Sequence, residues 1–164
     1  MKKQKTFINT SKLEISRFLA TFFYVGYFPK APGTFASIFA AVLIFIFPNI
    51  SILWQAILII FLLLIGKSSS AYLEKELNIE DPQYIVIDEV LGMCIAVFAL
   101  PRMLSVIIIG FVLFRIFDIW KPWIIDEIQS VKNGWGVMLD DLIAGVFALA
   151  INYLIHKIYF LFFI

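Results

Sequence analysis

Two pairs of acidic residues stand where apolar stretches of the chain begin. Asp88-Glu89 opens one stretch and Asp140-Asp141 opens another. Ionised carboxylates are costly in apolar surroundings, so residues of this kind are commonly functional. Crowded carboxylates at low dielectric must be neutralised by protonation or by a cation, and an oxygen-rich cluster suits Mg²⁺, Mn²⁺ or Ca²⁺. The pairs therefore predict a metal site with Asp88, Glu89, Asp140 and Asp141 as its ligands.

A further carboxylate, Asp118, stands between two basic residues. Arg115 precedes it by three positions and Lys121 follows it by three, so the three share one face of a helix. One interpretation is a set of salt bridges that tie helices together. Two cations cannot neutralise five carboxylates, however, and Arg115 and Lys121 could instead hold the oxygens of a phosphate. Backbone N–H groups at Gly33 and Thr34, where another apolar stretch opens, could add an anion site.

This combination of groups suits the hydrolysis of a phosphate monoester, because the dianionic phosphate must above all be neutralised. A metal ion held by carboxylates can bind phosphoryl oxygens and lower the pKa of a bound water molecule. The nucleophile is then either that water or one of the aspartates. With one Cys and one His, the chain lacks the parts of a two-histidine phosphatase, and Cys94 opens no phosphate-binding loop. The predicted catalytic residues are Asp88, Glu89, Asp118, Asp140 and Asp141.

The composition indicates that these residues are carried by membrane helices. Of the 164 residues, 62% are apolar and 15% are charged, whereas a soluble domain is nearer half apolar and a quarter charged. The formal net charge of +1 leaves no basic face, which argues against a nucleic-acid partner. The fold class predicted for residues 1–164 is a single all-α, polytopic membrane bundle of four or five spans.

Five apolar stretches are candidates for these spans. No charge occurs from Ala31 to Gly66, a length of roughly 54 Å as one helix, which is too long for a hydrocarbon core of about 30 Å. Pro48-Asn49 near the middle indicates a turn, so the region is predicted to form a helical hairpin. The predicted spans are 35–47, 50–65, 84–100, 103–120 and one from 138 to at least 155.

The distribution of Lys and Arg predicts the orientation. Most of them fall in residues 1–30, 66–83 and 120–137, which five spans would place on one side, and this side is predicted to be cytoplasmic. Residues 1–30 are predicted to form an N-terminal segment with an amphipathic helix at the membrane surface; a flexible tail is the alternative. Every candidate site residue then lies at the cytoplasmic end of a span.

Four motifs, in order and spacing, resemble the phosphatidylglycerophosphatase A family over roughly residues 20–150. The motifs are Ala31-Pro32-Gly33-Thr34, Ile85-Val86-Ile87-Asp88-Glu89-x-x-Gly92-Met93, Phe114-Arg115-Ile116-Phe117-Asp118-x-x-Lys121-Pro122-Trp123 and Gly136-Val137-Met138-Leu139-Asp140-Asp141-x-x-Ala144-Gly145. The chain departs from the family pattern at loop and packing positions, for example at Ala36 and Ile124, while the charged motif residues are intact.

The resemblance implies a Mg²⁺-dependent integral phosphatase of the bacterial inner membrane. Its substrate would be phosphatidylglycerol phosphate, whose terminal phosphate is removed to give phosphatidylglycerol, and no protein partner is expected. Two other classes remain open from the residues: an ion-coupled transporter or channel, and another enzyme acting on phospholipid headgroups. A carboxylate cluster at one membrane face rather than at the bilayer midplane fits a transporter poorly.

Overall fold

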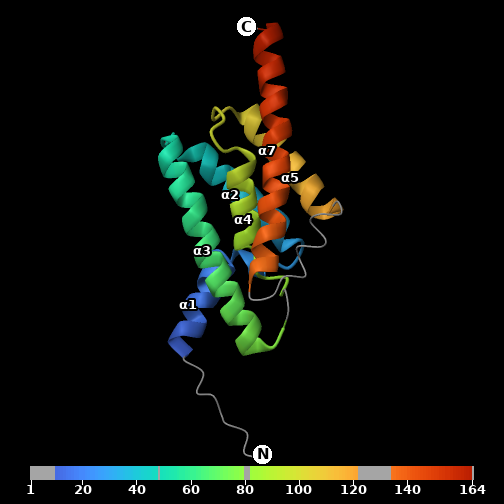
Figure 1. Ribbon diagram of the computed structural model, residues 1–164. Coiled ribbons are helices and arrows are strands. Elements are labelled where there is room, and N and C mark those ends of the chain that lie inside the picture. Colours follow the sequence, from blue (N-terminus) through green and yellow to red (C-terminus); the bar gives the residue numbers. More distant parts are fainter. Residues whose placement is uncertain (1–9, 48, 80–81, 122–133, 164) are drawn as a thin grey trace, which may run out of the picture.

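The computed structural model describes residues 10–47, 49–79, 82–121 and 134–163. These residues form helices and no strand, so the predicted all-α class is confirmed for them (Figure 1). The helices are α1 (Thr10–Ala20), the short 3₁₀-helix η1 (Val25–Tyr27), α2 (Pro32–Ile46), α3 (Ile52–Leu77), α4 (Ile87–Ala96), α5 (Leu104–Trp120) and α7 (Trp135–Phe163).

Two helices, α3 and α7, are long and apolar enough to cross a membrane. Only 17% of the most apolar window of α3 is buried, so most of its apolar surface needs a cover that the described chain does not provide. The 15 residues of α2, 10 of α4 and 17 of α5 give lengths of about 22, 15 and 26 Å, short of a hydrocarbon core of about 30 Å. Helices α3 and α7 are candidate membrane spans, which is consistent with a membrane protein, and a bundle of four or five crossings stays a prediction.

One helix extends beyond the span that was predicted from the distribution of charged residues. The predicted second span ended at residue 65, but α3 continues to Leu77. Ser68 and Ser69 donate hydrogen bonds to the carbonyls of Leu64 and Ile65, so these polar side chains are accommodated inside the helix. Helix α3 ends where Asn78 adopts a left-handed conformation with φ 53°.

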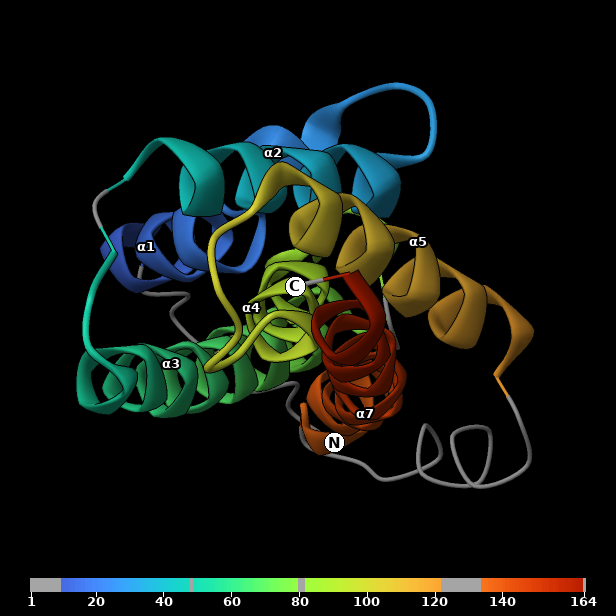
Figure 2. The ribbon, with the colours of Figure 1, turned by 90° about the horizontal axis from the view of Figure 1, so that it is seen from above.

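Helix α4 occupies the centre of the bundle. It packs against α2, α3, α5 and α7, and Figure 2 shows it enclosed by them. After its acidic first turn, α4 is apolar on all sides, as is typical of a helix buried within a protein. The predicted third span continued to residue 100, but α4 ends at Ala96, and Ala99 takes a left-handed φ of 57° just before Pro101. The central helix is therefore a half-length helix inside the protein.

Two glycines bring α4 against α7. A Cβ atom on Gly145 would lie 2.7 Å from the carbonyl oxygen of Gly92, and one on Gly92 would lie 2.3 Å from the ring of Phe114. Gly92 and Gly145 lie one turn after Asp88 and Asp141, and the structure places neighbouring helices beside them. The close approach fixes the separation of the two acidic pairs, because no side chain lies between the backbones.

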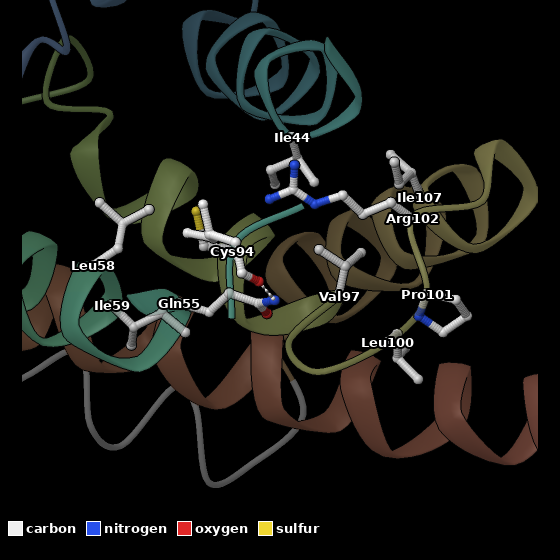
Figure 3. A pocket seen from close by; sticks show the side chains of 11 residues that line it. Ile44, Gln55, Leu58, Ile59, Cys94, Val97, Leu100, Pro101, Arg102 and Ile107 are labelled. Atoms are coloured by element: carbon white, nitrogen blue, oxygen red, sulfur yellow. Dashed lines mark hydrogen bonds between the residues drawn. The ribbon is translucent and has the colours of Figure 1, made fainter. Parts of the chain in front are cut away.

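Polar contacts tie the loops together at the end of the bundle where α4 finishes. The Gln55 side-chain oxygen accepts a hydrogen bond of 3.0 Å from the Ala99 N–H. Arg102 donates to the carbonyl oxygen of Phe47. Gln55, Arg102 and Ile44 line a cavity of about 50 Å³, and Figure 3 shows their side chains around it. Arg102 thus joins the residues after α2 to the loop between α4 and α5, and Gln55 joins the first turn of α3 to the same loop.

Candidate active site

A larger cavity of about 370 Å³ lies at the opposite end, where α2, α4 and α7 begin and α5 finishes. Alternating helix directions bring these four ends together, although they are separated by up to a hundred residues in the sequence (Figure 1). All nine residues predicted for the site line this cavity: Gly33, Thr34, Asp88, Glu89, Arg115, Asp118, Lys121, Asp140 and Asp141.

Helix ends determine where the charges stand. Asp88 and Glu89 occupy the first turn of α4, where the partial positive charge of a helix N-terminus favours carboxylates. Gly33 lies in the first turn of α2, which opens with Pro32. Helix α5 runs in the opposite direction. Its C-terminal end therefore places Arg115, Asp118 and Lys121 at the same cavity.

Three carboxylates converge in the cavity. Asp88, Glu89 and Asp141 each offer an oxygen, and these oxygens all lie within 4.8 Å of one another. Asp88 Oδ1 and Glu89 Oε2 are buried and have no hydrogen-bond partner among the described residues. Buried polar atoms without a partner are rare and costly, so a ligand that binds these two oxygens would stabilise the triad. All three donors are oxygens, which suits a hard divalent cation, and the residues present therefore fit Mg²⁺.

The remaining two carboxylates are held by the two cations. Arg115 Nη1 lies 2.6 Å from Asp118 Oδ2, and Lys121 Nζ lies 2.9 Å from Asp140 Oδ2. The other Asp140 oxygen accepts a hydrogen bond of 2.9 Å from the backbone N–H of Asp141. Of the four predicted metal ligands, three thus form the triad, and the fourth, Asp140, has both oxygens in other bonds. The ion-pair interpretation holds for Asp118 and Asp140, while the cation site formed by the other three carboxylates stays a prediction.

Lys121 remains a cation at the rim of the cavity. Burial by itself would lower the pKa of its ammonium group, but the hydrogen bond and charge of Asp140, with the charges of Asp118 and Asp141, more than offset this and raise the pKa. Lys121 follows the last residue of α5 and has a left-handed φ of 41°. This conformation turns the chain out of α5 beside Asp140 on α7.

Two polar residues, one in contact with Arg115 and one lining the cavity, were not anticipated from the sequence. Ser37, fully buried on α2, donates a hydrogen bond of 2.8 Å to the Gly33 carbonyl, and its oxygen lies 3.5 Å from Arg115 Nη1. Gln83 lines the cavity ahead of α4. The signal for Ser37 was its position four residues after Gly33, which places it on the same helix face. Gln83 carries no such signal, because its place depends on how the loop before α4 folds.

Gly33→Ala is expected to lower kcat/KM on the order of 10²-fold, because a Cβ atom there would lie 1.9 Å from Glu89 Oε1 and would force that carboxylate out of place. The melting temperature is expected to change little, since alanine favours the helix and the displaced group lies at a cavity. Steady-state kinetics and thermal unfolding of the purified variant measure both. An unchanged kcat/KM would show that Glu89 has no fixed place in the reaction.

The chain matches the sequence model of one protein family, described as Phosphatidylglycerophosphatase A, over residues 18–156. It is 36% identical to phosphatidylglycerophosphatase A of Escherichia coli over 88% of the chain and 87% of that protein. It is 33% identical to the Haemophilus influenzae phosphatidylglycerophosphatase A over 84% of the chain and 86% of that protein.

A third relative, from Bacteroides thetaiotaomicron, is named as a candidate phosphatidylinositol-3-phosphatase. It is 37% identical over 79% of the chain and 86% of its own length. No solved structure matches the chain. The family match extends from the end of α1 well into α7 and so includes every helix end that forms the cavity. The chain therefore belongs to the phosphatidylglycerophosphatase A family of phosphatases.

Proposed function

We propose that the chain is a Mg²⁺-dependent lipid phosphatase that hydrolyses the terminal phosphate of phosphatidylglycerol phosphate to give phosphatidylglycerol and phosphate. It would act at the cytoplasmic face of a bacterial inner membrane. The observation that carries the proposal is the triad of Asp88, Glu89 and Asp141 in the same cavity as Arg115 and Lys121. Cation ligands beside phosphate-binding groups are what the hydrolysis of a phosphate monoester requires.

The triad would hold the metal ion, which when bound supplies charge neutralisation and acidifies a water molecule. Asp88 and Glu89 sit on adjacent positions of α4, while Asp141 comes from α7. The contact between Gly92 and Gly145 sets the distance between these helices and so preorganises the ligands.

Arg115 would bind the phosphate. Its Nη1 is engaged by Asp118, while its Nε is buried and has no partner within the described chain. A guanidinium group presents several donors in a fixed plane, so an incoming phosphate can take donors that Asp118 leaves open. Lys121 would contribute a further charge, and the backbone N–H groups of Gly33 and Thr34 stand at the first turn of α2.

The nucleophile is proposed to be a water molecule, with an aspartate as the alternative. Asp140 and Asp118 are held in ion pairs, which leaves them poorly placed to attack phosphorus. The triad carboxylates are better explained as cation ligands. Asp140 would then act by positioning Lys121, and Asp118 by positioning Arg115.

The test is release of inorganic phosphate by the purified full chain in mixed micelles of detergent and phosphatidylglycerol phosphate. Turnover is expected with Mg²⁺, and a chelator is expected to abolish it until Mg²⁺ is restored. Phosphatidic acid and phosphatidylinositol 3-phosphate serve as comparison substrates and are expected to turn over more slowly. Full turnover in chelator would refute the metal requirement. Hydrolysis of either comparison lipid alone would refute the proposed substrate.

A further inference from the structure

The turn between α1 and α2 has an unusual backbone. Three consecutive residues, Phe22, Phe23 and Tyr24, adopt left-handed conformations with φ of 43°, 58° and 68°. This region is unfavourable for residues with a Cβ atom, and glycine would enter it freely. The turn is nevertheless closed by a hydrogen bond of 2.9 Å, which the Gly26 N–H donates to the Thr21 carbonyl. Aromatic residues occupy positions that suit glycine, which indicates that their side chains serve a purpose.

Phe23 and Tyr24 project outward, whereas Phe22 packs against the core. We call residues 21–28 the aromatic turn; about half of the surface of Phe23, Tyr24, Tyr27 and Phe28 is exposed, at 54%, 48%, 48% and 48%. Ring contacts join the members, including a stack of Tyr24 on Tyr27 with centroids 6.1 Å apart. An exposed cluster of large aromatic rings of this kind marks an interaction surface.

The cluster continues onto the exposed apolar face of α2. Phe28 contacts Phe35 with ring centroids 3.8 Å apart, and Phe22 contacts Phe39 at 6.1 Å. Phe35 and Phe39 are themselves 38% and 41% exposed on α2. The aromatic turn and this face of α2 therefore form one continuous apolar surface.

The aromatic turn also packs against the segment that leads into α4 and the cavity. A Cβ atom on Gly26 would lie 2.0 Å from the Tyr84 carbonyl oxygen, and Tyr27 stacks on the Tyr84 ring at 5.5 Å. The Val86 N–H donates to the Ala20 carbonyl at 2.9 Å, two residues before Asp88. The segment that leads into the acidic first turn of α4 thus rests directly on the aromatic turn.

We propose that the aromatic turn lies in the boundary between headgroups and acyl chains of the phospholipid bilayer and sets the height of the cavity relative to the lipid phosphates. Three observations support this occupant. The surface continues along apolar α2, it includes tyrosines whose hydroxyl groups suit the headgroup level, and it is followed by exposed Lys30, which complements anionic lipid. The bilayer is also the cover that the exposed apolar surface of α3 requires.

Fluorescence quenching tests the location without any requirement for activity. Phe23→Cys, in a Cys94→Ala background, is labelled with an environment-sensitive fluorophore and placed in phosphatidylglycerol–phosphatidylethanolamine vesicles. Lipids with a nitroxide near the headgroup are expected to quench it several-fold more than lipids with a nitroxide near the chain end, and iodide is expected to quench it weakly. Ile60→Cys on the exposed face of α3 and Lys75→Cys near its C-terminal end are the controls for deep and aqueous positions.

Two outcomes would overturn the proposal. Quenching of the Phe23 position by iodide, as at Lys75, would place the turn in water. Protection from all three quenchers would mean that protein covers it, as a second copy of the chain could. Failure of the proposed phosphatase function is a separate result, because it appears as absence of phosphate release in the wild-type chain, whatever the quenching shows.

Discussion

Asp141→Asn and Asp88→Asn are each expected to lower kcat at least about 10³-fold, because each removes a charge from the triad and with it several kcal/mol of transition-state stabilisation. Asparagine has almost the same shape as aspartate, so packing of α4 and α7 should persist. Phosphate release from phosphatidylglycerol phosphate measures the loss. The matched control is Glu76→Gln near the C-terminal end of α3, which lies outside the cavity and is expected to retain full activity.

A second measurement on the same variants separates loss of the cation from loss of the fold. Mg²⁺ that binds the native chain raises its melting temperature, and this increase is expected to be smaller in Asp141→Asn and Asp88→Asn. A variant that keeps the full Mg²⁺-dependent increase and full kcat would contradict the assignment of these residues as ligands. Asp140→Asn is expected to keep the increase, because its oxygens are engaged by Lys121 and the Asp141 N–H.

Arg115→Gln is expected to lower kcat/KM about 10²- to 10³-fold, the usual effect of removing a donor aimed at developing charge. The substitution also leaves Asp118 without its cation, so a carboxylate in the cavity would repel the phosphate. The control is Arg102→Gln at the opposite end of the bundle, where arginine bonds to the Phe47 carbonyl. It is expected to change kcat/KM by less than about threefold. Equal losses in the two variants would show that arginine at 115 is only structural.

The clustering of the site was accessible from the sequence because helices alternate in direction. Charged residues at the start of one apolar run and the end of the next must then lie at the same end of the bundle, as Asp88 and Asp118 do. The sequence did not show which carboxylates converge in the triad and which form ion pairs. Asp140 pairs with Lys121 and stays outside the triad. This choice depends on the direction in which a single side chain points, and residue spacing does not determine that direction.

Two features of the fold were also not predicted from the sequence patterns. An apolar run cannot distinguish a helix that faces lipid from one buried in protein, so α4 was expected to be a longer span than its ten residues. The left-handed conformations of Phe22, Phe23 and Tyr24 contradict the local preference of these residues, and tertiary contacts with Tyr84 and Val86 hold the turn in place. Sequence patterns report local preference, and both features arise from packing.

The half-length central helix would limit the permeability of a membrane crossed by α3 and α7. Above the acidic first turn of α4 stand Leu91 and Met93, both fully buried, and Phe114 from α5 closes the same layer. This apolar layer lies between the candidate active-site cavity and the small cavity beside Cys94 at the other end. A membrane potential gives each translocated charge about 2.3 kcal/mol per 100 mV, so a hydrated path through a carboxylate cluster would dissipate it. By ending the polar region within one turn of α4, the fold would allow the proposed chemistry on a charged headgroup without an ion leak.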